Sequence, residues 1–207
     1  MTDELVHLDV DGDVVTITLD SPHNRNALSR QLVTELLDAL ATARDDESRV
    51  VVIRSADRVF CSGADLKEAG AGGMEEGTRA LVELQRRIVA HRKPVVVRLA
   101  GPVRAGGLGI VAAADVVVCA DDVTFAFTES RLGLAPAVIS LTVLPRLTAR
   151  AASDTFLTGR TFDAAEAVAM GLVTRAVPAA DLDAEVDRVC TDLAQAHPQG
   201  QIGRAHV

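Results

Sequence analysis

The sequence is poor in the features that mark disulfide-linked, zinc-binding, secreted and membrane-spanning proteins. Its three cysteines, Cys61, Cys119 and Cys190, are an odd number without the spacing of a zinc site. The opening Met-Thr-Asp-Glu is no basic, apolar signal segment, and no apolar run reaches the length of a membrane span. The longest such run, Val111–Ala120, is interrupted by Asp115. These absences predict a reduced, cytoplasmic protein without a metal site.

Positive charge is also scarce relative to negative charge. The chain has 21 Lys and Arg against 29 Asp and Glu, a net charge of −8. Because a polyanion would be repelled on average, nucleic acid and an anionic membrane surface are not expected partners. The 207 residues, 48% of them hydrophobic, fit one domain with a substantial core, which we assign to residues 1–200.

Short apolar runs alternate with amphipathic segments along the chain. Val50–Ile53, Val95–Leu99 and Val116–Ala120 read as buried strands. Residues 32–40, which follow the candidate N-cap Ser29, and residues 79–90 carry apolar side chains at helical spacing. An Asp-Gly turn at residues 11–13 joins two further strands into a hairpin. The pattern predicts an α/β architecture with parallel strands.

Two stretches rich in small residues each follow an apolar run. The first is F-C-S-G-A-D-L-K-E at residues 60–68, and the second is G-P-V-R-A-G-G-L-G at residues 101–109. We expect each to join a strand to a helix, with the first helix beginning at Asp65 and the second covering residues 110–114. Backbone N–H groups at such helix starts are free to bind an oxygen that becomes negative.

Together these two stretches resemble the two-part oxyanion hole of the crotonase (enoyl-CoA hydratase/isomerase) superfamily. The resemblance extends from about Leu5 to Gln199 and includes the stretch from Leu157 to Val173. It implies a crotonase-like ββα superhelix and an acyl-CoA substrate, with no cofactor beyond the coenzyme A of that substrate. It also implies that the N–H groups of Ala64 and Gly106 bind the thioester oxygen, with Gly107 as the adjacent alternative.

Glu129 is the candidate acid/base group. It stands between apolar segments in F-A-F-T-E-S-R-L-G-L, where partial desolvation would raise its pKa and suit it to proton transfer at the carbon beside a thioester. The stretch resembles the family segment that carries a catalytic glutamate. The alternative is a loop glutamate paired with Arg131.

The chain departs from the hydratases of this family at Gly109, where they commonly carry a second glutamate. With Glu129 alone, we rank a hydratase first, a 3,2-enoyl-CoA isomerase second and a non-catalytic acyl-CoA-binding subunit third. Residues 128–140 resemble hydratases of branched, carboxylated thioesters such as 3-methylglutaconyl-CoA. If position 109 faces the acyl group, Gly109→Glu is expected to restore the missing carboxylate.

The remaining site assignments also come from the resemblance. H-N-R-N-A-L at residues 23–28 matches the family's N-A-L motif, which makes Arg25 a candidate for the phosphates of coenzyme A, although a solvated loop arginine is an equal alternative. Further substrate contacts are assigned to Ala27, Ser62, Asp65 and Leu66.

The glycine-rich residues 69–73 are expected to form a mobile connection, which in the family covers the acyl pocket. Relatives continue beyond His197-Pro198 into helices that support a trimer, so we regard the C-terminal helical part as incomplete. A homotrimer or hexamer is expected of a complete chain. Residues 201–207 fit no family pattern and translate CAG-ATC-GGA-AGA-GCA-CAC-GTC, a common sequencing adapter, so they are predicted to be a non-native tail.

Overall fold

The structure of the chain, a computed structural model, describes residues 3–68 and 73–201. The predictions of a mobile connection and of a non-native tail fall almost entirely on residues 69–72 and 202–207, outside the described residues. Of the predicted tail only Gln201 is described, and its amide donates a hydrogen bond to the Leu193 carbonyl at 3.1 Å.

A six-stranded sheet forms the centre of the molecule, in the order β1-β2-β3-β4-β6-β9. The first two strands form an antiparallel hairpin and every later pair is parallel. The turn of this hairpin places Gly12 at φ 56°, a backbone conformation that favours glycine. The strands are β1 Val6–Asp11, β2 Val14–Leu19, β3 Val50–Ser55, β4 Val95–Leu99, β6 Val116–Ala120 and β9 Arg175–Val177.

A second, smaller sheet has the order β5-β7-β8. Its strands are β5 Val103–Arg104, β7 Thr124–Ala126 and β8 Phe162–Asp163, and β5 pairs with β7 in parallel. The chain therefore repeats two strands and a helix, which confirms the predicted α/β class and the crotonase-like ββα arrangement.

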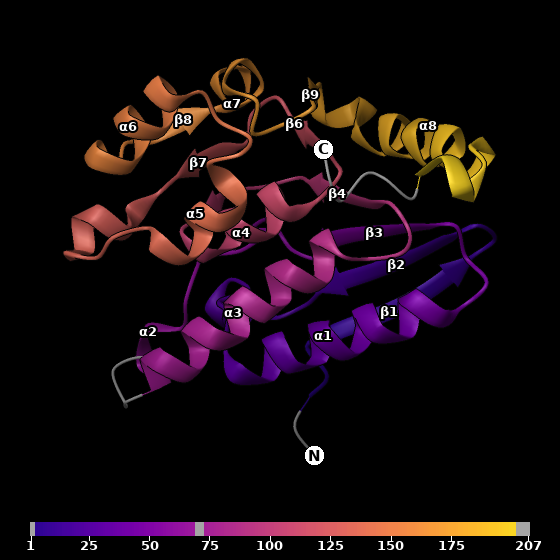
Figure 1. Cartoon of the computed structure of the whole chain (residues 1–207), viewed down its shortest axis with the longest axis horizontal. Helices are drawn as coiled ribbons and strands as arrows, with labels where there is room; N and C mark the ends of the chain where they lie inside the picture. The colour runs from indigo at the N-terminus through magenta and orange to yellow at the C-terminus, as the bar shows by residue number, and fades with distance from the viewer. Residues whose placement is uncertain (1–2, 69–72, 202–207) are drawn as a thin grey trace.

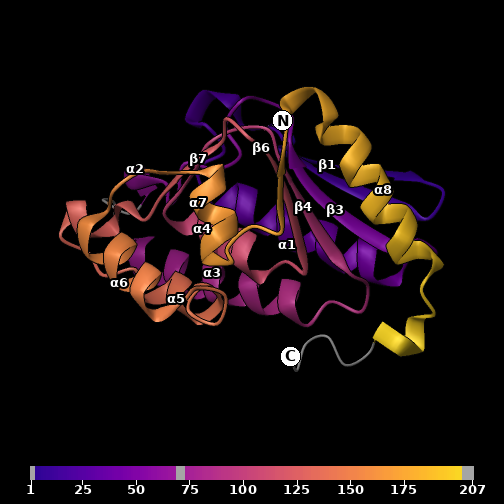
Figure 2. The ribbon, with the colours of Figure 1, turned by 90° about the horizontal axis from the view of Figure 1, so that it is seen from above.

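The described residues contain helices of varied length. They are α1 Arg30–Asp45, α2 Leu66–Glu68, α3 Met74–Val89, α4 Gly106–Ala113, α5 Ala137–Val143, α6 Ala149–Thr158, α7 Ala164–Met170 and α8 Leu182–Gln195, with 3₁₀ turns at Pro22–Asn24, Thr128–Leu132 and Ala179–Asp181. Figure 1 shows α1 and α3 running side by side, and these helices contact each other. Figure 2 shows α5 and α6 at one end of the molecule and α8 at the other.

Local sequence fixes several helix ends. The Ser29 hydroxyl accepts the N–H of Leu32 at the start of α1, as the spacing predicts. Asp163 and Glu166 form a reciprocal capping box at the start of α7, and Gly171 closes that helix at φ 90°.

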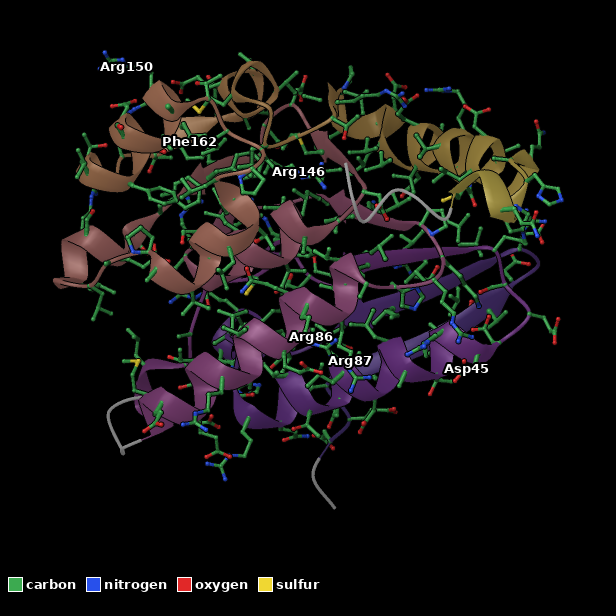
Figure 3. All side chains as sticks on the ribbon, in the orientation of Figure 1. Asp45, Arg86, Arg87, Arg146, Arg150 and Phe162 are labelled. Atoms are coloured by element: carbon green, nitrogen blue, oxygen red, sulfur yellow. The ribbon has the colours of Figure 1, made fainter. Side chains whose placement is uncertain are left out.

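Phe162 and Arg146, both labelled in Figure 3, stabilise the second sheet and α4, respectively. Phe162 on β8 stacks on Phe125 of β7, with ring centroids 5.6 Å apart. Arg146 donates to the carbonyls of Ala112 and Ala114 at the C-terminal end of α4. A cation at this end stabilises the helix because the carbonyls there carry partial negative charge.

Of the two predicted helix starts, the first is confirmed to within one residue and the second is wrong. After β3 and the loop of residues 56–65, α2 covers Leu66–Glu68, and the Asp65 carboxylate accepts N–H groups of its first turn. The second helix begins at Gly106 rather than residue 110, so the glycines form its first turn. Glycine is a poor helix former, but it is needed here because a Cβ on Gly107 would lie 2.7 Å from the Cβ of Cys61.

Candidate active site

Three parallel chain segments converge on the candidate site. Cys61 pairs with Val103 of β5 through an isolated parallel bridge, and Val103 pairs with Phe125 of β7. Just beyond these paired positions, the segments reach Ala64, Gly106 and Glu129, respectively. Since parallel strands end at the same edge of a sheet, this register brings together three groups that are distant in sequence.

The first two groups are backbone N–H donors. Within residues 3–68 and 73–201, no hydrogen bond uses the N–H of Ala64 or Gly106. Gly106 is the first residue of α4, where N–H groups have no partner inside the helix. Both donors are thus free to bind an oxygen atom that gains negative charge.

The two donor segments are in contact. A Cβ placed on Gly63 would lie 3.6 Å from the Gly106 nitrogen, and one placed on Gly106 would lie 3.8 Å from the Ala64 nitrogen. Gly63 itself has φ 98°, and its Cβ would meet that of Ala105 at 2.8 Å. Glycine at position 63 is therefore required both by its backbone conformation and by the close approach of the two segments.

Ala105, which precedes the second donor, has a strained backbone with φ 45° and ψ −122°. Strain of this kind costs about 1–3 kcal/mol and often lies at functional sites. Its N–H donates to the Ala126 carbonyl, and its own carbonyl accepts from Leu108. These bonds fix the turn that directs the Gly106 N–H.

The N-A-L stretch supports the first donor segment. Asn26 is 1% exposed, and its amide accepts from Ser21 N–H and donates to the Val59 carbonyl. Leu28 N–H donates to the Gly63 carbonyl at 2.8 Å. The motif therefore holds the loop that carries Ala64.

A cavity of about 440 Å³ lies against these groups. Six of the residues assigned to the site by sequence line it, namely Ser62, Ala64, Asp65, Leu66, Gly106 and Glu129. Most of the other lining residues are apolar. They come from the N-A-L loop, α3, η3 (Thr128–Leu132), the connection of residues 133–136 and the start of α5, and they include Leu28, Leu81, Leu132, Leu134, Pro136, Val138 and Ile139.

Glu129 contributes a carboxylate whose environment suits proton transfer. Its Oε2 is buried and has no hydrogen-bond partner among the described residues. Burial raises its pKa above the ordinary 4.5. Arg131 directs its Nε to the Thr158 carbonyl at 3.5 Å, and no ion pair joins it to Glu129 in the described part of the chain. The alternative of a paired loop glutamate is therefore not what the structure shows.

The other two carboxylates of the cavity wall are already engaged. Asp65 accepts the N–H groups of Lys67 and Glu68 at the start of α2. Glu68 accepts the N–H of Arg30 at 2.8 Å. Glu129 is thus the cavity carboxylate with a buried, unpartnered oxygen among the described residues.

Three residues assigned by sequence do not line the cavity. Arg25 is exposed with φ 60°, and its backbone carbonyl accepts the N–H of Ser62. Ala27 is buried, 6% exposed, and Gly107 packs on Cys61. These residues support the loops around the cavity.

The expectation for position 109 requires a correction. Gly109 is buried and outside the cavity wall, and a Cβ there would lie 2.9 Å from Oε1 of Gln85 and 3.0 Å from Cγ2 of Ile139. A side chain at this position would meet Gln85 before it reached the cavity. Gly109→Glu alone is therefore not expected to place a second carboxylate at the acyl group.

Sequence reasoning missed two residues of α3, Leu81 and Gln85. Leu81 lines the cavity, whereas it was assigned to an apolar stripe. Gln85 interrupts the same stripe between Leu81 and Ile88, and it is 2% exposed. A polar residue within an apolar helical stripe was the signal that could have identified it.

Metal-ligand clusters and membrane-spanning helices are both absent from the part of the chain that the structure describes. Neither residues 3–68 nor 73–201 contain three or more His, Cys, Asp or Glu side chains grouped as metal ligands. No helix in those ranges is long and apolar enough to cross a membrane.

The sequence is similar to proteins of known type. Residues 9–201 match the family model for enoyl-CoA hydratase/isomerase. A putative enoyl-CoA hydratase from Thermus thermophilus is 33% identical over 194 residues, which cover 90% of this chain and 77% of the relative. A 4-chlorobenzoyl coenzyme A dehalogenase from Arthrobacter is 34% identical, covering 97% of this chain and 77% of that protein.

The fold has close structural relatives too. A crystal structure of an enoyl-CoA hydratase from Mycobacterium avium is 44% identical, with a TM-score of 0.90, and the match covers 99% of this chain and 82% of the relative. The names of these relatives refer to both hydration and dehalogenation, so similarity at this level does not by itself select the reaction.

Proposed function

Because the chain belongs to the enoyl-CoA hydratase/isomerase (crotonase) superfamily, we propose that it catalyses the reversible hydration of an enoyl-CoA thioester. The observation that carries this proposal is the placement of two free N–H donors and one unpartnered carboxylate around a single cavity. The N–H groups of Ala64 and Gly106 bind the thioester oxygen as it becomes an enolate. Glu129 transfers the proton at the adjacent carbon.

An apolar acyl group suits the cavity better than a carboxylated one. The wall is largely leucine, isoleucine, valine, alanine and proline, and its charged members in the described range are Asp65, Glu68 and Glu129. A carboxylate on the acyl chain would be repelled by them. Among candidate substrates we therefore place uncharged 2-enoyl thioesters before 3-methylglutaconyl-CoA.

A 3,2-enoyl-CoA isomerase is the second candidate. It is favoured by Gly109, which leaves Glu129 as the sole proton-transferring carboxylate of this proposal. One base that removes a proton from one carbon and returns it to another completes an isomerisation without activating water.

We also propose how the rest of the substrate and the protein are arranged. Arg25 is exposed beside the loop that carries Ala64 and binds the phosphates of coenzyme A. No cofactor is needed beyond the coenzyme A of the substrate. With a complete C-terminus, the assembly is a homotrimer or hexamer, a proposal supported by the exposed leucines Leu141 on α5, Leu144 at its C-terminal end and Leu157 on α6. The three free, buried cysteines support a location in the cytoplasm.

The test compares Glu129→Gln with the parent on a 2-enoyl-CoA and a 3-enoyl-CoA, with both products identified. The variant should bind acyl-CoA and lose turnover. Glu75→Gln is a matched control because Glu75 is exposed on α3 and pairs with Arg79. Hydrated product from the parent supports the hydratase, and a shifted double bond alone supports the isomerase. Binding without any turnover by the parent would leave only the acyl-CoA-binding subunit.

A further inference from the structure

A buried polar group lies directly behind the cavity wall. Gln85 of α3 and Thr142 of α5 are 2% and 9% exposed, and the Thr142 hydroxyl donates to Oε1 of Gln85 at 2.7 Å. The same hydroxyl lies 3.1 Å from the Gly109 carbonyl oxygen of α4. Gln85 and Thr142 together therefore connect three helices, α3, α4 and α5, at the inner side of the cavity.

The orientation of this amide follows from its neighbours. Its Nε2 faces the carbonyls of Leu81 at 3.1 Å and Val138 at 3.4 Å, so it must be the donor end. Leu81 and Val138 both line the cavity, as does Ile139. Gln85 thus holds the residues that form the wall in front of it.

The same side chain fills the space above Gly109. A Cβ there would meet Oε1 of Gln85 at 2.9 Å and its Cδ at 3.0 Å, closer than ordinary van der Waals contact. Gln85 cannot easily move aside because its amide bonds three groups in the buried interface. A large residue at position 85 and a side chain at position 109 are therefore mutually exclusive in this packing.

We propose that Gln85 is a specificity-determining residue that closes the inner end of the acyl cavity and takes the space that a side chain at position 109 would need. It acts through Leu81, Val138 and Ile139, which meet the end of the acyl chain. This inference rests on the proposed acyl-CoA function. The chain therefore prefers short acyl groups, and the neutral amide of Gln85 occupies the space that a second carboxylate would need.

The packing part is tested without any substrate. Gly109→Ala should lower the unfolding temperature of the parent, and it should lower it much less in a Gln85→Ala background, where the added methyl group enters the vacated space. Additive effects of the two substitutions would show that the side chains do not share this space and would overturn the inference.

The specificity part is tested by the ratio of kcat/KM for 2-octenoyl-CoA to that for crotonyl-CoA. Gln85→Ala should raise this ratio by about tenfold or more, since even one methylene in an apolar pocket changes discrimination by roughly 10–200-fold. Gln85→Met keeps the volume and should leave the ratio within about twofold of the parent. If Gln85→Ala does not fold, Gln85→Ser is used, because it retains a polar group for Thr142.

Thr155→Ala is the control for loss of a buried polar group. Thr155 is fully buried on α6, and its hydroxyl bonds the Ala151 carbonyl of its own helix. The Thr155→Ala variant should be less stable than the parent and should leave the ratio of the two kcat/KM values unchanged. An unchanged ratio in the folded position-85 variant overturns the specificity role.

Failure of the proposed function is distinguishable from failure of this inference. If the parent turns over neither of these thioesters and does not convert a 3-enoyl-CoA either, the hydratase and the isomerase are refuted. The preference for acyl length is then measured from the dissociation constants of octanoyl-CoA and butyryl-CoA. Gln85→Ala should bind octanoyl-CoA more tightly relative to butyryl-CoA than the parent does. An unchanged relative affinity overturns the inference.

Discussion

Replacing Gly106 by proline removes one of the two N–H groups that we assign to the thioester oxygen. The Gly106 N–H enters no hydrogen bond among the described residues, but proline there would also disturb Ala105, whose φ 45° and ψ −122° differ from the extended backbone that a residue before proline adopts. An amide-to-ester replacement at residue 106 is therefore measured beside the proline variant. Loss of one oxyanion donor costs about 2.7–4 kcal/mol, or roughly 10²–10³ in kcat. We expect a decrease of this size in turnover of crotonyl-CoA.

Gly106→Ala is the matched control, because it adds a Cβ and retains the N–H. That Cβ would lie 3.0 Å from Cδ1 of Leu28, 3.2 Å from Cδ2 of Leu81 and 3.8 Å from the Ala64 nitrogen. The two carbon atoms are ends of flexible side chains, so the added methyl group should cost about 1 kcal/mol of stability. Its kcat should fall less than about tenfold, which is far less than the proline variant.

Steady-state kinetics on both folded variants, with thermal unfolding as the check on folding, measures the difference. A proline variant within about threefold of the alanine variant would refute the assignment of the Gly106 N–H. An amide-to-ester replacement at residue 106 removes the same N–H without adding a ring. It should reproduce the loss seen with proline.

The remaining predictions concern Glu129, the glycine contact, the helix cap and the coenzyme A loop. Burial raises the pKa of Glu129 above 4.5, so ionisation of this side chain at higher pH destabilises the folded state. Near neutral pH, Glu129→Gln should therefore unfold at the same temperature as the parent or at a higher one. That difference should disappear at about pH 4 and below, where Glu129 is protonated in both the folded and the unfolded parent, and a lower unfolding temperature of the variant at neutral pH would contradict the burial argument. Gly63→Ala, with φ 98° and a 2.8 Å contact to the Ala105 Cβ, should lose roughly 2 kcal/mol or more in denaturant unfolding, and a neutral result would show that the two donor segments are not in close contact. Asp163→Ala removes the α7 capping box and should cost about 1 kcal/mol with kcat unchanged, so a large fall in kcat would link α7 to the site. Arg25→Ala should raise KM for the CoA thioester with little change in kcat, and an unchanged KM would leave Arg25 as a solvated loop residue.

The sequence was sufficient to predict the repeated elements and the three central groups. The apolar runs at β3, β4 and β6 are strands, and the stripes at α1 and α3 are helices, because periodicity and end signals agree there. Ala64 and Gly106 were predicted from the resemblance of two small-residue stretches to the family's oxyanion hole, and Glu129 from its apolar flanks together with the same resemblance. The structure places all three at one cavity.

Sequence reasoning failed where tertiary packing overrides local preference. The glycines of α4 have low helix propensity, yet the helix begins at Gly106 because α4 packs closely against Cys61 and Leu28. The direction of position 109 depends on α3, which is distant in sequence. Only the packed structure shows that Gln85 occupies that direction.

The central claim is that Glu129 removes a proton from the carbon beside the thioester while the two N–H groups stabilise the resulting enolate of the substrate. Exchange of that proton with solvent tests this claim most directly. Butyryl-CoA is incubated in deuterated buffer with the parent and with Glu129→Gln, and deuterium at that carbon is followed by NMR, while binding is measured separately. The account predicts exchange by the parent and its loss in Glu129→Gln, with binding retained. Equal exchange by both proteins, or none by a parent that binds butyryl-CoA, would contradict it.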